Sequence, residues 1–452
     1  MIEKPPAWKK SFSSDLFQKA LQSESLQNLI KKADKEYAYW SKFKHYPVTD
    51  EFNINEAWAF LKFTRFSNRE VTLIKTERGE SFSFTTTKTM YQRLSYIDSN
   101  TSGFIRSAWA KPTELQKNQL IISSLSEEAI ASSQIEGANT SRKIAKEMIL
   151  TQRKPRTRSE QMIINNYQVM QRLLEWKDLD LSIDILLELQ QNITSNTLDD
   201  ANDSGRLRDS SDDENNPIKV VDSLTGETVY DPPKSELVKI ELESLIRYAN
   251  TEENEENFIH PVIKASILHF WLAYLHPFVD GNGRTARALF YWYLLKRNYW
   301  MFQYLSVSRV IRSSKKRYDN AYLYSEIDDN DLTYFLQYKL KVIIQAIEDF
   351  ASHYKKKMEK EKRIKGFSSL LSKMNERQIE ALYYLHTHPQ KTIDISSHKA
   401  RHLIAYQTAR TDLIKLAEKG YISQMVNGKK YEYVPNVNVI KNLFSTNESK
   451  IS

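Results

Sequence analysis

One segment near the middle of the 452-residue chain combines side chains suited to a phosphate with one suited to moving a proton. It reads His276-Pro277-Phe278-Val279-Asp280-Gly281-Asn282-Gly283-Arg284-Thr285-Ala286-Arg287. The histidine titrates near neutrality, so it suits a general base, and the carboxylate suits Mg²⁺ bound to phosphate oxygens. The glycine-rich turn can present backbone N–H groups to an anion beside two arginines three residues apart. Together these groups favour phosphoryl or nucleotidyl transfer.

Each of these features also has an ordinary structural interpretation. A histidine near a helix end is often structural, Gly-Asn-Gly is often a turn, and arginines three residues apart often form a solvated face. We favour the site because the flanking residues 265–275 and 286–295 are apolar and predict buried helices. Unpartnered arginines between such helices would be costly.

The segment resembles, at every fixed position, the signature H-P-F-x-[DE]-G-N-G-R-x-x-R of the Fic family. The resemblance extends more weakly over about residues 116–350. It implies a mainly α fold, a Fic-type helical bundle with the motif between two central helices. It also implies a nucleotidyltransferase: a protein adenylyltransferase that moves AMP from ATP to a Ser, Thr or Tyr hydroxyl of a target protein, or of itself, and releases pyrophosphate.

The resemblance assigns a role to each matching position. His276 takes the proton from the target hydroxyl, for which it must be neutral. Asp280 holds Mg²⁺ on the α and β phosphates. The expected ATP ligands are the backbone of Gly281 to Gly283, the Asn282 side chain, Arg284 for the β phosphate and Arg287 for the γ phosphate.

A second stretch, Ser132-Ser133-Gln134-Ile135-Glu136-Gly137, resembles the inhibitory motif [ST]-x-x-x-E-[GN] of the same family. It would lie in an inhibitory helix at about residues 125–137, with Ser132 and Glu136 on one helical face. The resemblance implies that Glu136 pairs with Arg287. Because one guanidinium cannot serve both a carboxylate and the γ phosphate, ATP would bind in an unproductive pose. We therefore expect autoinhibition.

Two other uses of the same site remain open. Glu136 could instead position a water that removes AMP from a modified protein, and a related variant transfers another phosphate-containing group. The sequence does not separate these reactions from adenylylation.

Residues 218–221 and 228–230 predict a β-hairpin around the turn 224–227. In the Fic family a flap at this position, here about 217–231, docks an extended segment of the target. An ordinary surface hairpin is the alternative. The candidate flap or adenine contacts are Val220, Val221, Tyr318 and Tyr322. The stretch Gly205-Arg206-Leu207-Arg208 resembles a G-x-x-R pattern common before the flap, with no assigned role.

Residues 371–436 predict a separate winged helix-turn-helix domain. Helices are expected at 376–386, 393–404 and 406–419, and strands at 421–426 and 430–434 flank an Asn-Gly turn. The candidate DNA contacts on the last helix are Gln407, Thr408, Arg410 and Lys415. The domain suits a DNA-binding regulator, but a protein-binding or dimerising module fits as well.

The remaining organisation is simpler. Residues 1–115 read as mostly helical with a short hairpin at 71–75 and 81–86, residues 199–216 as a loop, and 437–452 as a tail. Residues 351–370 read as a basic linker, whose basic run 355–365 is a helix extension or a linker. His398 and His402 lie four residues apart, and we expect them on a solvated face, because no cysteine or His-Glu-x-x-His pattern supports zinc.

The composition and the absence of certain motifs exclude several classes of protein and of functional site. The chain has no cysteine and therefore no disulfide or thiol nucleophile. It has no P-loop, no third glycine for a dinucleotide fingerprint and no apolar run long enough for a membrane span. The first residues lack the apolar core of a signal peptide, so the cytoplasm is the expected location. The net charge of +8 permits acidic partners without requiring them.

Overall fold

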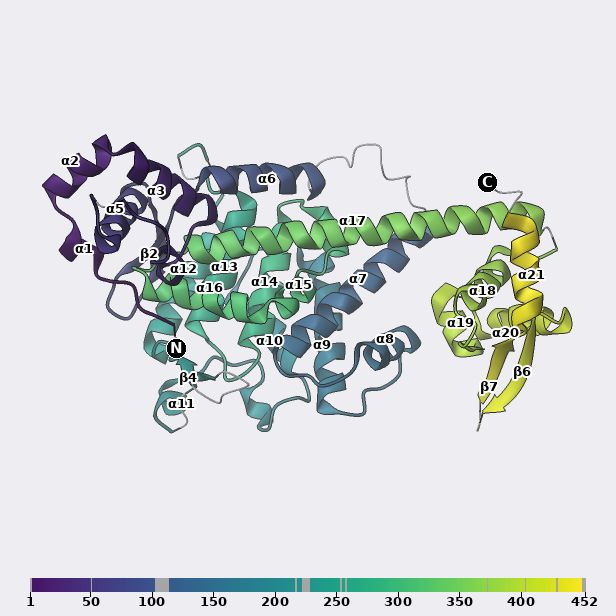
Figure 1. Ribbon diagram of the computed structural model, residues 1–452. Helices are drawn as coiled ribbons and strands as arrows, with labels where there is room; N and C mark the ends of the chain where they lie inside the picture. The colour runs from purple at the N-terminus through teal and green to yellow at the C-terminus, as the bar shows by residue number, and fades with distance from the viewer. Residues whose placement is uncertain are drawn as a thin grey trace. The chain divides into compact units, whose positions relative to one another are not determined.

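The computed structural model describes residues 2–49, 51–101, 114–215, 218–221, 228–252, 254–256, 258–371, 373–402, 404–427 and 430–448 (Figure 1). The expected hairpin turns at 224–227 and at Gly428 lie outside these residues. The chain divides into two units, one of Met1–Thr140 and Arg156–Glu348 and one of Ser141–Pro155 and Asp349–Ser452. The fold is mainly α-helical, as the sequence predicts.

The first unit begins with a small helical region. Its elements are α1 (Trp8–Ser11), α2 (Ser14–Gln22), α3 (Glu24–Glu36), α4 (Trp40–Phe43), α5 (Ile54–Ser67), the antiparallel pair β1 (Glu70–Lys75) and β2 (Ser81–Phe84), and α6 (Lys88–Thr101). Trp58 on α5 and Phe43 on α4 are fully buried and lie 5.3 Å apart, ring centre to ring centre. This region therefore has an aromatic core of its own.

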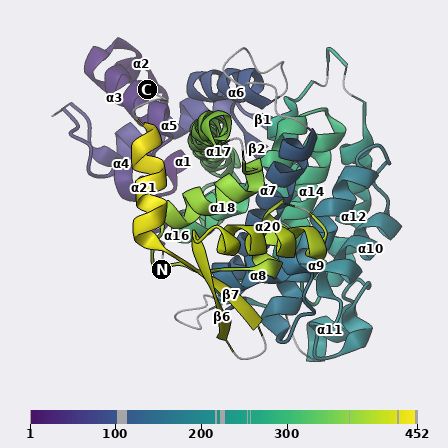
Figure 2. The same ribbon diagram turned by 90° about the vertical axis from the view of Figure 1, so that its right-hand side faces the viewer.

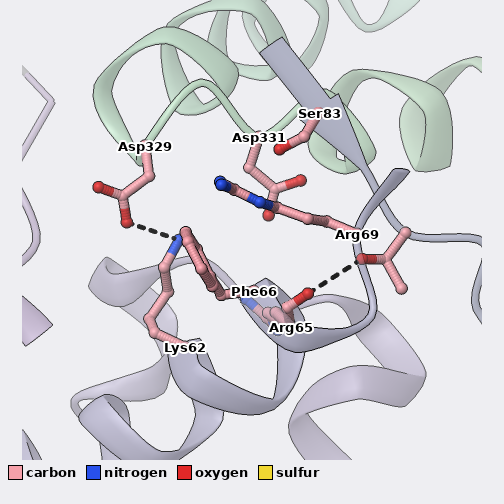
Figure 3. A pocket seen from close by; sticks show the side chains of 8 residues that line it. Lys62, Arg65, Phe66, Arg69, Ser83, Asp329 and Asp331 are labelled. Atoms are coloured by element: carbon pink, nitrogen blue, oxygen red, sulfur yellow. Dashed lines mark hydrogen bonds and ion pairs between the residues drawn. The ribbon is translucent and has the colours of Figure 1, made fainter. Parts of the chain in front are cut away.

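Helix α5 joins the segment that follows α16 through buried charges (Figure 3). Lys62 Nζ lies 2.8 Å from Asp328 Oδ1 and 3.3 Å from Asp329 Oδ2, and Arg65 pairs with Asp34. The cavity beside them, lined by Lys62, Arg65, Asp329 and Asp331 among others, measures about 20 Å³, which is room for about one water molecule. The cluster thus holds two parts of the unit together.

The rest of the first unit is the helical bundle that carries the signature. Its elements are α7 (Glu114–Ile135), α9 (Arg158–Trp176), α10 (Ile183–Thr194), η1 (Ala201–Asp203), α11 (Ser210–Asn215), β3 (Val220–Val221), β4 (Thr228–Tyr230), α12 (Ser235–Asn250), α13 (Pro261–Leu275), α14 (Asn282–Lys296), η2 (Trp300–Tyr304), α15 (Val307–Ser313), α16 (Lys315–Ile327) and the start of α17 (Thr333–Leu370).

Helices α13 and α14 pack against each other at the centre of this bundle (Figure 1). Helix α13 is apolar on nearly all sides, and almost every residue of both helices is buried, as expected of central helices. Pro261 opens α13, and the His260 ring accepts a hydrogen bond from the Val262 N–H at 3.3 Å. The residues between α13 and α14 are the turn of the signature.

The segment expected to be a loop at 199–216 contains η1 and α11 instead. The acidic residues that read as loop chemistry start a helix: Asp209 Oδ1 accepts from the Ser211 N–H at 2.9 Å. Asp212 Oδ2 accepts from the Asp209 N–H at 2.8 Å. Carboxylates near a helix N-terminus accept hydrogen bonds from its free N–H groups and interact favourably with the positive end of the helix dipole. The loop prediction was therefore wrong here.

The second unit contains a three-stranded sheet and helices packed on it (Figure 2). Its elements are α8 (Arg142–Thr151), the end of α17, α18 (Glu376–Thr387), β5 (Ile393–Asp394), α19 (Ile395–His402), α20 (Tyr406–Glu418), β6 (Ile422–Asn427), β7 (Lys430–Pro435) and α21 (Val437–Glu448). The strand order is β5-β7-β6, and both pairs are antiparallel. The segment 393–394, expected to be helical, is a strand too short to show a period of two.

Two segments of this unit, expected as a helix extension or linker and as a tail, are helical. Residues 351–370 belong to the continuous helix α17, and its Ile364 and Phe367 are buried in the core of this unit. The expected tail contains α21, whose Ile440 and Phe444 are buried in the same core. Apolar residues four apart mark one helical face, and burying that face stabilises the helix.

Buried polar groups fix α20. Asp412 accepts hydrogen bonds from Arg377 Nε at 2.7 Å and Asn375 Nδ2 at 2.8 Å, and His398 Nε2 lies 3.4 Å from it. His398 is buried, not solvated as expected from its spacing to His402. Among the described residues no three histidine or carboxylate side chains group as metal ligands.

No helix within the described part of the chain has both the length and the apolar character to cross a bilayer.

Candidate active site

His276 occupies the position directly after the last residue of α13. Its backbone is left-handed, with φ 51° and ψ 55°, a conformation in which histidine is enriched among non-glycine residues. Nδ1 lies 3.2 Å from the Ala273 carbonyl oxygen, which can only accept, so Nδ1 carries the proton. Burial lowers the pKa of His276. The imidazole is therefore neutral near pH 7, with the lone pair on Nε2.

Arg208 holds the backbone that presents this histidine. Its Nε donates to the His276 carbonyl at 2.8 Å, and its Nη2 donates to the Leu275 carbonyl at 3.2 Å and to the Pro233 carbonyl. Its Nη1 pairs with Asp213 at 2.5 Å. A cation at the C-terminus of α13 satisfies the free carbonyls there. Arg208 is thus a positioning residue whose role the sequence did not reveal, although the G-x-x-R resemblance included it.

Asn282 locks the turn between the two central helices. Its Oδ1 accepts from the Phe278 N–H at 2.9 Å, and its Nδ2 donates to the Phe278 carbonyl at 2.7 Å. Phe278 itself is fully buried. The side chain expected to contact phosphate therefore serves the turn in this state, and the backbone N–H of Asn282 remains at the start of α14.

The two glycines of the turn serve different purposes. Gly281 has φ +89°, which L-residues rarely adopt, and its carbonyl accepts the first hydrogen bond of α14, from Thr285. Gly283 is helical, so of the two glycines only Gly281 has a positive φ. A Cβ on Gly283 would lie 2.2 Å from Glu136 Oε1. A larger residue at position 283 would therefore have to displace the carboxylate of Glu136.

Arg284 is buried but weakly partnered. Its Nη1 lies 3.2 Å from the Ile193 carbonyl and its Nη2 lies 3.3 Å from Asp280 Oδ1. Its Nε has no hydrogen-bond partner among the described residues. A buried guanidinium with so few acceptors suits a site that receives an anion.

Asp280 is the one carboxylate of the signature, and its side chain is 44% exposed. It also accepts a hydrogen bond from the Gly281 N–H at 2.5 Å. Since Mg²⁺ binds one or two carboxylates and completes its shell with phosphate oxygens and water, this single half-exposed carboxylate fits the ion only together with a nucleotide.

The guanidinium group of Arg287 is bound by Ser132 on α7 and by Glu136. Its Nη2 lies 2.8 Å from Glu136 Oε1 and 3.0 Å from the Ser132 carbonyl, and its Nε donates to Ser132 Oγ at 2.8 Å. Burial raises the pKa of Glu136, but Arg287 and Arg284 outweigh burial and the pKa lies below its ordinary value. The carboxylate is therefore ionised near neutral pH and blocks this guanidinium.

Glu136 lies one residue beyond α7, not on the helix as expected. The Ala138 N–H donates to the Ser133 carbonyl at 3.0 Å, the Gly137 N–H donates to the Gln134 carbonyl at 3.2 Å, and Gly137 has φ +92°. This is the pattern of a Schellman C-cap, which places glycine in the left-handed conformation. Gly137 thus fixes the end of the helix that presents Glu136.

The remaining predicted contacts are those expected for adenine, for the flap and for DNA. Tyr318 is buried, and its hydroxyl lies 2.9 Å from His269 Nε2 and 3.2 Å from the Tyr322 hydroxyl. Val220 pairs with Tyr230 across the β3–β4 hairpin, and Val221 pairs with Thr228. The candidate DNA contacts Gln407, Thr408, Arg410 and Lys415 are all exposed on α20 in the second unit.

Comparison with known proteins gives a family for part of the chain. Residues 180–294 match the Fic/DOC family. Protein adenylyltransferase fic-1 of Caenorhabditis elegans is 32% identical over 117 residues, 26% of this chain and 20% of the relative. Protein adenylyltransferase Fic of Drosophila mojavensis is 38% identical over 68 residues, 15% of this chain and 13% of the relative. The chain thus spans a fifth or less of the length of these curated relatives.

Two solved structures resemble the chain. A Fic family protein from Desulfovibrio desulfuricans G20 has a TM-score of 0.46 at 18% identity, with 76% of this chain and 94% of that chain covered. Fic-1 from Caenorhabditis elegans has a TM-score of 0.45 at 20% identity, with 58% and 71% covered.

Proposed function

The chain contains a Fic/DOC family domain at residues 180–294, and from this premise we propose that it is a protein adenylyltransferase that transfers AMP from ATP to a hydroxyl of a target protein. The observation that carries the proposal is the arrangement at the α13–α14 turn. A neutral histidine with its Nε2 lone pair lies beside a helix N-terminus, an under-partnered buried arginine and a half-exposed carboxylate.

The proposed chemistry uses these groups in order. His276 Nε2 accepts the proton of the target hydroxyl while that oxygen attacks the α phosphorus, and pyrophosphate leaves. The N-terminus of α14 and Arg284 bind the phosphates. Asp280 would hold Mg²⁺ together with the phosphate oxygens, and the ion when bound neutralises charge on the phosphates.

The resting state is proposed to be inhibited. Arg287, the ligand expected for the γ phosphate, is paired with Glu136 and Ser132. A charge-assisted hydrogen bond to a buried arginine contributes about 1.5–3 kcal/mol, so ATP must compete with this pair for the guanidinium.

Labelling with radioactive ATP and Mg²⁺ tests the proposal. We expect weak self-labelling by the wild type and an increase of about tenfold or more in Glu136→Gly, since about 1.4 kcal/mol corresponds to tenfold. The double variant Glu136→Gly/His276→Ala should lose the label. Labelling of the double variant at the rate of Glu136→Gly alone would exclude His276 as the base.

Removal of AMP is the alternative at the same site. In that reaction Glu136 would position water, so release of AMP from a modified protein should be lost in Glu136→Gln. The Glu136→Gly labelling product, identified by mass spectrometry in lysate, distinguishes AMP from another phosphate-containing group and names the acceptor.

A second function, DNA binding, is favoured by the winged unit. The first turn of α20 exposes Gln407, Thr408 and Arg410, and the β6–β7 wing follows it. A salt titration of duplex DNA binding by the full chain tests this. Binding should weaken with salt, and Arg410→Ala should weaken it further. Absence of salt-dependent binding at low ionic strength would favour the protein-binding or dimerising alternative.

A further inference from the structure

A cavity of about 270 Å³ lies at the base of the β3–β4 hairpin, outside the phosphate site. The turn between β1 and β2 forms one wall, and residues from β2, β4, α13 and α16 form the others. Its lining residues used below are Glu77, Arg78, Phe82, Tyr230, Tyr274 and Glu326. Neither the signature nor the inhibitory motif contains any of these residues.

Three aromatic rings form one side of the cavity. Tyr274 lies between the other two, with its ring centre 5.1 Å from that of Phe82 and 5.6 Å from that of Tyr230. The Tyr230 hydroxyl donates to the Tyr274 carbonyl at 2.8 Å, which fixes the Tyr230 ring. Aromatic faces within about 6 Å attract cations through the ring quadrupole.

Most of the ionisable carboxylates and cations that line the cavity are acidic. The carboxylates at the cavity are Glu77, Glu80, Asp231 and Glu326, against the single cation Arg78. Glu77 and Glu80 have partners, because they accept from the Lys234 N–H at 2.9 Å and from Asn330 Nδ2 at 3.3 Å.

Glu326 differs from the other acids. It makes no hydrogen bond or ion pair with the residues that the structure describes. Burial raises its pKa to about 8. An isolated carboxylate in such surroundings is costly and is stabilised by a cation that enters beside it.

One residue that lines the cavity, Tyr274, is close in sequence to His276, the proposed base. Tyr274 precedes His276 by two residues, and two residues span at most about 7 Å. Tyr230 is the last residue of β4, so the cavity also borders the hairpin proposed to dock the target. A target segment docked on this hairpin can therefore place a side chain in the cavity.

We propose that this cavity is a subsite for a lysine or arginine side chain of the target protein, bound by Glu326 between the rings of Phe82, Tyr230 and Tyr274. The proposal rests on the proposed function, because it concerns the protein that receives the AMP. It makes the adenylyltransferase select hydroxyls that lie near a basic residue.

Binding of the cation should depend on pH. Glu326 must be ionised to pair with it, so affinity for a basic segment should rise as the pH increases through about 8. The titratable or charged groups around Glu326 are Tyr230 and Asp231 at the hairpin, Tyr274 on α13, Tyr322 on α16, and Glu77, Arg78 and Glu80 on the β1–β2 turn. The tyrosines remain neutral over this range, since burial raises the pKa of all three.

The test uses paired synthetic peptides and the Glu136→Gly protein. Each peptide carries one acceptor hydroxyl and either a lysine or its neutral isostere norleucine at scanned offsets. We expect the best lysine peptide to be labelled about tenfold faster than its norleucine partner. Adding Glu326→Gln should remove that preference while the norleucine peptide is labelled as before, which also shows that the variant is folded. Glu243→Gln, at an exposed carboxylate on α12, is the matched control and should keep the preference.

Binding measured without ATP gives an independent readout. The anisotropy of the fluorescent lysine peptide should show tighter binding at pH 9 than at pH 6.5 for Glu136→Gly, and Glu326→Gln should abolish that difference. Free arginine amide that binds as tightly as the peptide would point to a small-molecule site and overturn the proposal. Equal labelling of lysine and norleucine peptides would also overturn it. Failure of Glu136→Gly to label any protein or peptide contradicts the proposed function instead.

Discussion

At the scale of single residues, Arg208 shows how much one buried cation can hold together. Its guanidinium bonds three carbonyl oxygens and one carboxylate. Arg208→Ala should lower the free energy of unfolding by about 3 kcal/mol, because it leaves buried acceptors without a donor. Urea unfolding measures this. Arg206→Ala is the matched control: Arg206 is 34% exposed, and loss of its pairs with Asp203 and Asp212 should cost about 0–1 kcal/mol. Equal losses in the two variants would contradict the assigned role.

The pKa of His276 gives a pH dependence. Burial lowers that pKa, and the base must be neutral, so labelling by Glu136→Gly should stay level from pH 8 to 7. It should then fall on acidification, with a midpoint below the ordinary imidazole value of about 6.5. The initial rate of labelling against pH measures the midpoint, and a midpoint above that value would contradict the buried, neutral imidazole.

Which of these residue roles the sequence could predict depends on how local the contacts are. The pattern of twelve residues placed His276, Asp280 and Arg287 near one another because they belong to one turn and one helix. It assigned the Asn282 side chain to phosphate, whereas both its polar atoms bond Phe278. Arg208 lies 68 residues from His276, and its contacts follow only from the tertiary fold.

At the scale of elements, the C-cap of α7 controls where Glu136 lies. Gly137 has φ +92°, so Gly137→Ala strains the cap and should cost about 1 kcal/mol. Self-labelling should rise in Gly137→Ala, by less than in Glu136→Gly, because the carboxylate is displaced but present. In the Glu136→Gly background the same change should have no effect on labelling.

Gly420→Ala is the control for this strain. Gly420 has φ +74° and lies in the second unit, with no side-chain contact nearby for a Cβ to disturb. Both alanine variants should lose similar stability, but only Gly137→Ala should alter labelling. A rise in both would mean that general loosening, and not the position of Glu136, sets the activity.

Elements with strong patterns were predictable and those with mixed signals were not. The buried helix predicted at 265–275 lies within α13, Pro261–Leu275, because its apolar residues cover nearly every side of the helix. The acidic run before the hairpin favoured a loop by composition, yet its carboxylates cap α11. The short β5 has two residues, and pairing with β7, a partner distant in sequence, decides its conformation.

At the scale of the whole molecule, the core of the first unit contains a lysine. Lys339 is fully buried, with Nζ 3.2 Å from His269 Nδ1 and 3.7 Å from the centre of the Phe290 ring. Burial lowers its pKa from 10.5 to about 7. Between those pH values the unfolded chain binds more protons than the folded one, so stability from this group rises with pH.

Lys339→Met should remove that rise and should make the first unit more stable at pH 7. The free energy of unfolding of the wild type and of Lys339→Met, measured at pH 7 and at pH 9, tests both expectations. Glu326, whose pKa is raised, contributes the opposite slope below about pH 8, so the difference between the two proteins is the quantity to compare. If the two proteins differ in free energy of unfolding by the same amount at pH 7 and at pH 9, Lys339 is not a buried lysine with a lowered pKa.

The division of the chain was harder to predict than its helical character. The basic run at 355–365 indicated either a helix extension or a linker, and α17 continues through it to Leu370 as a helix extension. The sequence after residue 436 read as a tail, yet Phe444 is fully buried in the second unit. Such helices are stabilised mainly by the face they bury, which composition does not show.

The bonds of Arg208 also join His276, the proposed base, to the segments on both sides of the hairpin, through Asp213 before it and Pro233 after it. A shift of the hairpin therefore moves the guanidinium group of Arg208, which also binds the His276 carbonyl oxygen. A target that fits the hairpin poorly should be modified with a lower kcat as well as a higher KM, so that recognition and turnover change together.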